Sequence, residues 1–121
     1  MVTLTKAFTF DAAHILRNYV GKCNNLHGHT FRLEVTIRPS EHLPKAPENM
    51  VMDFGELKRL VDQTIISQLD HKFLNEVLDV DNCTSEYLVD YIVTKLYPVF
   101  KDSLIKIRLY ETEDSWCEWS A

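Results

Sequence analysis

The sequence predicts an α+β fold in which a four-stranded antiparallel sheet is covered on one face by two helices. Two patterns support this prediction. Apolar and polar residues alternate in residues 29–38 and 104–110, which is typical of strands with one buried face. In residues 53–69 and 84–98 apolar residues recur every three or four positions instead, which is typical of amphipathic helices. In chain order the elements are strand, strand, helix, helix, strand, strand.

Four segments have the composition or the alternation of strands. Residues 2–10 are rich in β-branched and aromatic side chains, which favour strands. Residues 29–38 and 104–110 alternate clearly, and a short last strand is expected over residues 116–119. Three prolines in residues 39–47 predict a surface loop, because proline cannot donate to a strand ladder.

The helix boundaries follow from capping residues and proline. We expect the first helix over residues 53–69, with Asp53 as N-cap and Glu56 at the position of a capping-box partner. The second helix is expected to begin after Thr84, a favoured N-cap residue, and to end at Pro98.

The composition describes one globular domain over residues 1–121 and disfavours several classes of partner. The chain is 45% hydrophobic and 26% charged, as ordinary soluble domains are, and its net charge of −5 argues against nucleic-acid binding. No apolar run is long enough to span a membrane, and the first residues lack the apolar region of a signal peptide. An odd count of three cysteines suggests free thiols in a reducing cytoplasm.

The predicted sheet also has consequences for assembly. Four strands leave two open edges, each with a row of unpaired backbone groups. Open edges of this kind are a liability unless another strand pairs with them. We therefore expect a homo-oligomer that forms through its sheet edges.

A cluster of histidines near the start of the second strand predicts a metal site. His27 and His29 share one face of a strand, and His14 on the neighbouring strand can supply a third nitrogen. Three protein ligands leave one tetrahedral position open, which is typical of catalytic zinc. Cys23 precedes His27 by four residues. It is either a fourth ligand in a closed structural site or a reactive thiolate beside the metal, and the spacing does not choose between them.

Two other sets of residues can carry acid–base or binding chemistry. Asp70 and His71 are adjacent at the end of the first helix. They can form a dyad in which the carboxylate orients the imidazole, although a histidine at a helix C-terminus is the commoner reading. Glu111 has the parity of the apolar face of its strand, where a carboxylate is costly unless it is paired. There it can accept the two N–H groups of a pterin or purine edge, unless a bulge turns it outward.

Taken together, several short blocks resemble the 6-pyruvoyltetrahydropterin synthase family, which has the tunnelling fold. The closer match is its bacterial queuosine-pathway branch, the 6-carboxy-5,6,7,8-tetrahydropterin synthases. The blocks occur in the family's order along nearly the whole chain, and the ordered set is specific although each block alone is weak. They are Phe8-Thr9-Phe10-Asp11-Ala12-Ala13-His14, Cys23-Asn24-Asn25-Leu26-His27-Gly28-His29, Val51-Met52-Asp53-Phe54, Leu69-Asp70-His71-Lys72-Phe73-Leu74-Asn75, Thr84-Ser85-Glu86 and Glu111-Thr112.

The resemblance implies a role for each candidate residue. By position in these blocks, the residues that match zinc ligands are His14, His27 and His29. Cys23 matches the catalytic thiol, and Asp70 and His71 match the acid–base pair. Glu111 matches the glutamate that anchors the pterin ring.

The resemblance also implies a reaction and an assembly. The substrate would be 7,8-dihydroneopterin triphosphate, and the product of the queuosine branch would be 6-carboxy-5,6,7,8-tetrahydropterin, with loss of triphosphate and acetaldehyde. The family assembles as a hexamer of two trimers, with active sites at subunit interfaces. The short chain and the Cys-x3-His spacing favour this branch over the biopterin branch. Two alternatives stay open, which are 6-pyruvoyltetrahydropterin synthase of the biopterin branch and a non-catalytic zinc- or pterin-binding module. One position departs from the pattern, because Cys83 stands where proline is usual.

Overall fold

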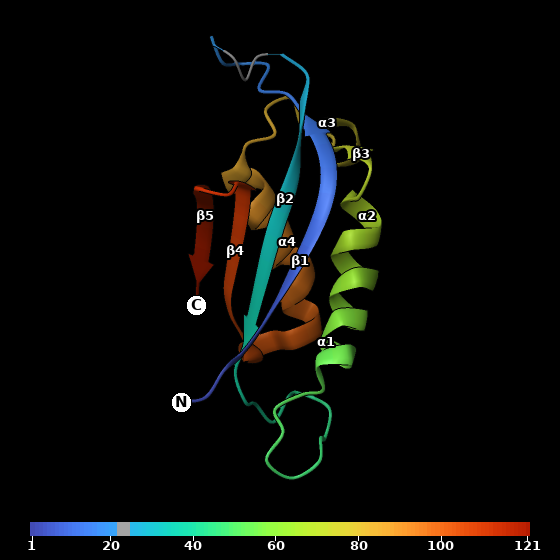
Figure 1. Ribbon diagram of the computed structural model, residues 1–121, viewed down its shortest axis with the longest axis vertical. Helices are drawn as coiled ribbons and strands as arrows, with labels where there is room; N and C mark the ends of the chain where they lie inside the picture. The colour runs from blue at the N-terminus through green and yellow to red at the C-terminus, as the bar shows by residue number, and fades with distance from the viewer. Residues whose placement is uncertain (22–24) are drawn as a thin grey trace.

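The computed structural model describes residues 1–21 and 25–121, and they form one sheet with helices packed against one of its faces (Figure 1). The strands are β1 (Leu4–His14), β2 (His27–Ile37), β3 (Lys72–Phe73), β4 (Leu104–Thr112) and β5 (Ser115–Ser120). The helical elements are α1 (Phe54–Val61), the π-helical turn η2 (Asp62–Ile66), α2 (Ser67–Leu69), α3 (Leu74–Val77), α4 (Ser85–Phe100) and the 3₁₀ turn η3 (Lys101–Ser103).

The sheet has five strands rather than the four expected from sequence. Its order is β3-β1-β2-β4-β5, and the four long strands pair antiparallel, as predicted. The fifth strand, β3, runs parallel to β1 beside Ala12 and Ala13, so the sheet is mixed. The prediction of a purely antiparallel sheet was wrong because a two-residue strand is too short to show any alternation. β3 begins at Lys72, directly after His71, so its pairing with β1 holds Asp70 and His71 beside β1.

The two N-terminal strands both extend further toward the histidines than the sequence indicates. β1 continues to His14 and β2 begins at His27, and these two residues are paired across the ladder. The inward faces of β1, β2 and β4 then supply a continuous apolar surface to the helices. Its fully buried members include Phe31, Leu33, Ile107 and Leu109. The histidines lie at the end of this buried face.

The helices follow the predicted stripes, with differences at their ends. Asp53 accepts from the N–H of Glu56 at 3.2 Å and Thr84 accepts from that of Tyr87 at 3.1 Å, so both predicted N-caps are confirmed. The Glu56 side chain bonds Arg59 instead of completing a capping box. α4 runs past Pro98 to Phe100, because a proline in the last turn forfeits only one backbone hydrogen bond.

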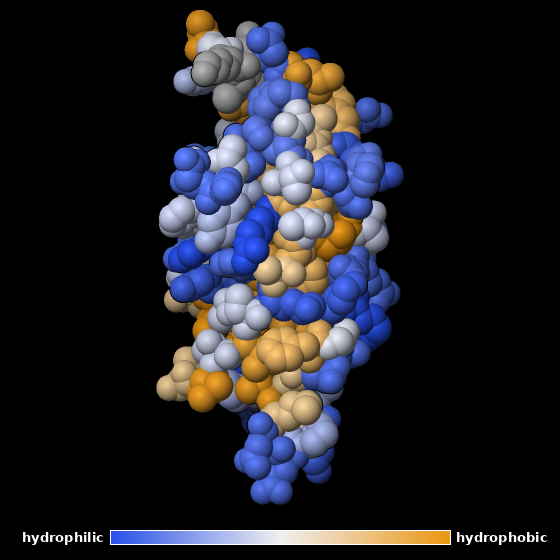
Figure 2. Space-filling view, in the orientation of Figure 1, coloured by the Kyte–Doolittle hydropathy of each residue, from blue (hydrophilic) through white to orange (hydrophobic). Residues whose placement is uncertain are grey.

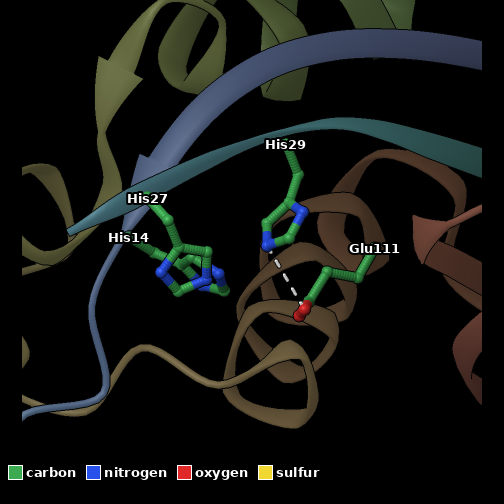
Figure 3. Close-up of side chains that lie close together, drawn as sticks. All are labelled: His14, His27, His29 and Glu111. Atoms are coloured by element: carbon green, nitrogen blue, oxygen red, sulfur yellow. Dashed lines mark ion pairs between the residues drawn. The ribbon is translucent and has the colours of Figure 1, made fainter. Parts of the chain in front are cut away.

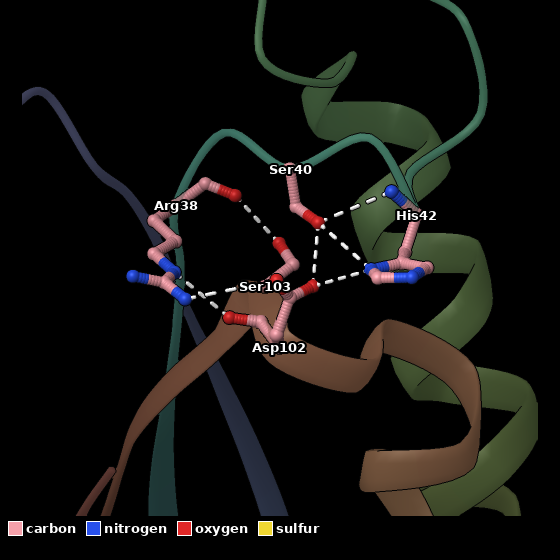
Figure 4. A network of polar contacts seen from close by, with 5 residues as sticks. All are labelled: Arg38, Ser40, His42, Asp102 and Ser103. Atoms are coloured by element: carbon pink, nitrogen blue, oxygen red, sulfur yellow. Dashed lines mark hydrogen bonds and ion pairs between the residues drawn. The ribbon is translucent and has the colours of Figure 1, made fainter.

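The proline-rich loop after β2 is anchored to the turn η3 by a polar network (Figure 4). The Asp102 carboxylate accepts from Ser40 Oγ at 2.5 Å and contacts His42 Nδ1 at 2.7 Å. Arg38 donates to the Asp102 carbonyl, and Ser103 donates to the carbonyl of Arg38. The hydrogen bond from Ser40 lowers the pKa of Asp102. This network lies at the opposite end of β2 from His27, so it fixes the loop without touching the histidines.

The other face of the sheet is open and mostly polar. Figure 2 shows hydrophilic side chains gathered over much of this face, beside a band of apolar colour. Arg108 is central to it, bonding Glu118 and Tyr110 and lying 5.2 Å from the ring of Trp116. Among the described residues, no helix is both long and apolar enough to cross a membrane.

Candidate functional site

Three imidazoles meet where β1 ends and β2 begins (Figure 3). His27 and His29 point to the same face of β2 because one residue separates them on a regular strand. His14 is the last residue of β1 and pairs with His27, so its ring falls beside theirs. The ring centroids lie 4.5 to 5.1 Å apart. Phe31, the next inward residue of β2, packs against two of these rings and closes the inner side of the cluster.

Backbone carbonyls orient two of the rings. His14 Nδ1 lies 2.9 Å from the carbonyl oxygen of Cys83, and His27 Nδ1 lies 2.6 Å from that of Asn25. A carbonyl oxygen can only accept, so each Nδ1 carries the hydrogen and each neutral ring keeps its lone pair on Nε2. Histidines that ligate metals are typically held in this way by a carbonyl or carboxylate on the other nitrogen.

The cluster contains buried nitrogens without a hydrogen-bond partner. In the described part of the chain, three buried side-chain polar atoms are unpaired, and two of them are His14 Nε2 and His29 Nε2. Burial lowers the pKa of both rings, an effect larger than the opposing effect of the Glu111 charge. The neutral form, which is the form that binds metals, is therefore favoured. Two unpaired Nε2 atoms in one cluster are what a metal would satisfy.

Glu111 reaches the same cluster from β4. Its Oε1 lies 3.3 Å from His29 Nε2, and its Oε2 accepts from Ser85 Oγ at 2.7 Å. The inward orientation predicted from strand parity is confirmed by this contact with His29, although the pairing of β4 with β5 is irregular between Tyr110 and Thr112. The contact to His29 forms within one chain.

These four side chains suit a divalent transition metal. One ligand atom from each of His14, His27, His29 and Glu111 lies within 4.8 Å of the others. Three imidazoles and a carboxylate form a donor set that zinc accepts, although imidazole suits several metals. The predicted zinc ligands are therefore brought together, and their role as ligands stays a prediction.

Asp70 and His71 form a second cluster, which is held by β1. Asp11 donates its N–H to Asp70 Oδ1 at 3.0 Å and accepts the His71 N–H on its carbonyl at 2.6 Å. His71 Nδ1 lies 3.0 Å from Asp70 Oδ1, so the carboxylate orients the ring and leaves Nε2 free. The Asp11 N–H lowers the pKa of Asp70 and keeps it ionised. Thr30 completes the cluster by donating to the Asp11 carboxylate at 2.5 Å.

The backbone of His71 is strained. Its φ is 60°, in the left-handed region that side chains other than glycine seldom adopt. Its side chain is 77% exposed, so burial of the ring does not compensate for this conformation. Strain of this kind in a native structure is concentrated at functional sites. Asn49, Asp79 and Lys101 also have a positive φ, so the dyad interpretation of Asp70 and His71 depends on their contact of 3.0 Å and stays a prediction.

The two clusters lie on different sides of the sheet. Asp11 and Thr30 point to the open face, whereas His14 and His29 point to the helix face, because neighbouring strand residues alternate. An open cleft of about 590 Å³ lies beside the acid–base pair, and its lining includes Asp11, Thr30 and His71 as well as His29. Within one chain, the donor atoms of Asp70 and His71 nevertheless form a group separate from those of the three histidines.

The remaining candidates fall outside the clusters or support them. Cys23 lies outside the described residues, so its predicted role stays a prediction. Cys83 is fully buried, as expected for a small residue, and burial raises the pKa of its thiol to about 11. Sequence reasoning missed the role of Asn75, which is buried and bonds the backbone of Ile15 next to His14. It also missed Ser85, for which no sequence pattern gives a signal.

Comparison with known proteins identifies the family of this chain. The chain is 35% identical to 6-carboxy-5,6,7,8-tetrahydropterin synthase of Haemophilus influenzae, over 98% of this chain and 99% of that protein. It is 33% identical to 6-pyruvoyl tetrahydrobiopterin synthase of Dictyostelium discoideum, over 95% and 93%. The structure of Caenorhabditis elegans 6-pyruvoyl tetrahydropterin synthase superposes with a TM-score of 0.82 at 28% identity, covering 99% of this chain and 95% of that one. The profile of the 6-pyruvoyl tetrahydropterin synthase family matches residues 3–121, and the chain belongs to that family.

Proposed function

We propose that the protein is a zinc-dependent lyase that converts 7,8-dihydroneopterin triphosphate and one water molecule to 6-carboxy-5,6,7,8-tetrahydropterin, triphosphate and acetaldehyde, in queuosine biosynthesis. The observation that carries the proposal is the set of three imidazoles with unpaired, inward Nε2 atoms beside a carboxylate. The family membership supports a pterin substrate, and the Haemophilus influenzae relative supports this product. The expected cytoplasmic location stays a prediction.

Each cluster has a separate task in this proposal. His14, His27 and His29 hold the metal, which when bound supplies a Lewis acid that polarises the side-chain hydroxyls of the substrate. Asp70 fixes the His71 ring through Nδ1, so His71 Nε2 is the atom that gives or takes a proton. Cys23 is the second proton-transfer group. Glu111 accepts N–H groups of the pterin ring, since its carboxylate lies on an otherwise apolar face.

The separation of the two clusters supports a site shared between copies. Asp70 and His71 belong to a group of side chains separate from the histidine cluster of their own chain, so in this proposal they serve the histidines of a neighbouring copy. Both edges of the sheet offer strands for pairing, because β3 covers only the end of β1 and β5 has one partner. We propose that pairing of these edges builds the oligomer, expected as a hexamer of two trimers.

The biopterin reaction is the second candidate, favoured by the Dictyostelium discoideum relative. Both reactions begin with the loss of triphosphate, and they differ in whether the side chain is then cleaved. The purified chain, loaded with zinc, should be incubated with 7,8-dihydroneopterin triphosphate and its products identified by mass spectrometry. We expect 6-carboxytetrahydropterin and acetaldehyde, and no turnover after removal of zinc with a chelator. A retained pyruvoyl side chain would establish the alternative, and metal-bound protein without turnover would indicate a binding module.

A further inference from the structure

We propose that Glu111 is a fourth, exchangeable ligand of the metal held by His14, His27 and His29, and that the Ser85 hydroxyl positions it. The pterin-anchoring role assigned to Glu111 above belongs to the substrate-bound state. Ligation belongs to the resting state, before substrate arrives. The exchange between these states rests on the proposed function, whereas ligation itself does not.

The spacing of the two donor atoms supports ligation. Glu111 Oε1 lies 3.3 Å from His29 Nε2, yet this contact is not aligned as a hydrogen bond and leaves His29 Nε2 unpaired. Two ligands of a tetrahedral zinc ion, each about 2.0 to 2.2 Å from it, are separated by roughly 3.4 Å. The observed separation is thus suited to two atoms that share a metal.

The surroundings of Glu111 support a fixed direction for the carboxylate. Ser85 occupies Oε2 with a hydrogen bond of 2.7 Å, so Oε1 is the oxygen that faces the imidazoles. The side chain is only 27% exposed, and its inward neighbours on β4 are Leu109 and Ile107. A half-buried carboxylate needs a compensating positive group. Among the described residues, the polar contacts of this carboxylate are to the uncharged Ser85 hydroxyl and to the His29 ring, and no lysine or arginine side chain forms an ion pair with it.

The two roles of Glu111 compete with each other. An oxygen atom that ligates the metal is not free to accept the N–H groups of a pterin ring. Arrival of the ring therefore draws Glu111 from the metal and opens the fourth position to the substrate side chain. Because binding linkage is reciprocal, a pterin that lacks side-chain hydroxyls should weaken metal binding.

Zinc affinity of the full chain, measured by competition with a chromophoric chelator, tests ligation without reference to turnover. Glu111→Gln should weaken zinc binding by about tenfold or more, because it replaces a charged ligand with a neutral one. Glu113→Gln is the matched control, since it removes a charge from an exposed neighbour and should change affinity by less than about twofold. Ser85→Ala should weaken binding by a smaller factor, and Ser85→Thr, which keeps the hydroxyl, should restore it. Equal affinities for Glu111→Gln and Glu113→Gln would overturn the proposal.

A second readout covers the case in which Glu111→Gln does not fold. The Co²⁺ form of the wild-type protein should change its visible absorption when 6-methylpterin is added, because a ligand leaves the metal. An unchanged spectrum at saturating 6-methylpterin would overturn the exchange. The outcomes are distinct from those for the reaction. Formation of 6-carboxytetrahydropterin together with a Glu111-independent zinc affinity would refute the inference alone, and Glu111-dependent zinc binding without pterin turnover would refute the proposed function alone.

Discussion

His14 Nδ1 donates a hydrogen bond of 2.9 Å to the carbonyl oxygen of Cys83, and this bond joins the end of β1 to the segment before α4. It fixes which nitrogen of His14 faces the cluster. Cys83, which stands where the family pattern has proline, thus orients His14 through its backbone carbonyl. Its buried side chain packs in the core. The candidate metal site therefore depends on a contact between residues 69 positions apart in sequence.

Metal binding should persist into mildly acidic solution. Protons compete with the metal for Nε2, and burial lowers the pKa of His14 and His29 below the ordinary value of 6.5. Zinc affinity should therefore stay nearly constant as pH falls from 8 to about 6.5, and decline only below that range. Chelator competition across this pH range measures the effect. A steep loss of affinity beginning above about pH 7 would contradict it.

The metal-free protein should lose stability as pH falls below about 6.5. A group whose pKa is lower in the folded chain than in the unfolded chain binds its proton preferentially after unfolding. The free energy of unfolding should therefore be largest above the unfolded histidine pKa, about 6.5, and fall as pH drops below it. Urea denaturation of the chelator-treated protein at pH 7.5 and pH 5.5 tests this. Bound zinc should enlarge the difference, because it keeps the imidazoles of the folded chain unprotonated while those of the unfolded chain still take up protons.

The left-handed backbone of His71 predicts that two substitutions there differ in stability although both abolish activity. Glycine adopts a φ of 60° without steric cost, whereas alanine does not. His71→Gly should therefore be more stable than His71→Ala by about 1 kcal/mol, and both should lack activity. Urea denaturation monitored by circular dichroism gives the difference. If the alanine variant proves the more stable of the two, His71 is not strained in solution.

The three cysteines should differ in reactivity. Burial raises the pKa of Cys83 to about 11 and also raises that of Cys117, so both thiols stay protonated at neutral pH. If Cys23 is the proton-transfer thiol, iodoacetamide at pH 7.5 should modify Cys23 before the other two. Peptide mapping by mass spectrometry identifies the labelled position. Preferential labelling of Cys83 would contradict both its burial and the role given to Cys23.

Local patterns predicted much of the fold because each depends on neighbours in sequence. Alternation placed β2 and β4, helical periodicity placed α4, and the caps Asp53 and Thr84 start their helices as expected. The strand β3 was missed because two residues have no period. The π-helical turn η2 was also missed, since its apolar spacing does not differ visibly from that of an α-helix.

The candidate site was predictable only where it depends on residues that are neighbours in sequence. Strand parity alone places His27, His29 and Glu111 on the covered face. Parity does not say which residues meet across the molecule, so the hydrogen bond from Ser85 to Glu111 and that from Asp11 to Asp70 required the structure. The location of Asp70 and His71 on the other side of the sheet depends on β3, which no sequence pattern indicated.

The most direct test of the account is the activity of mixed oligomers made from two inactive variants. His29→Ala removes a proposed metal ligand and His71→Ala removes the proposed acid–base group, and each alone should be inactive. If every site takes its histidine cluster from one copy and its Asp70–His71 pair from another, equal mixing leaves about one quarter of the sites intact. Co-expression of the two variants with different tags, followed by tandem purification, should therefore recover about a quarter of the wild-type turnover. Mixed oligomers as inactive as the separate variants would contradict a site shared between copies.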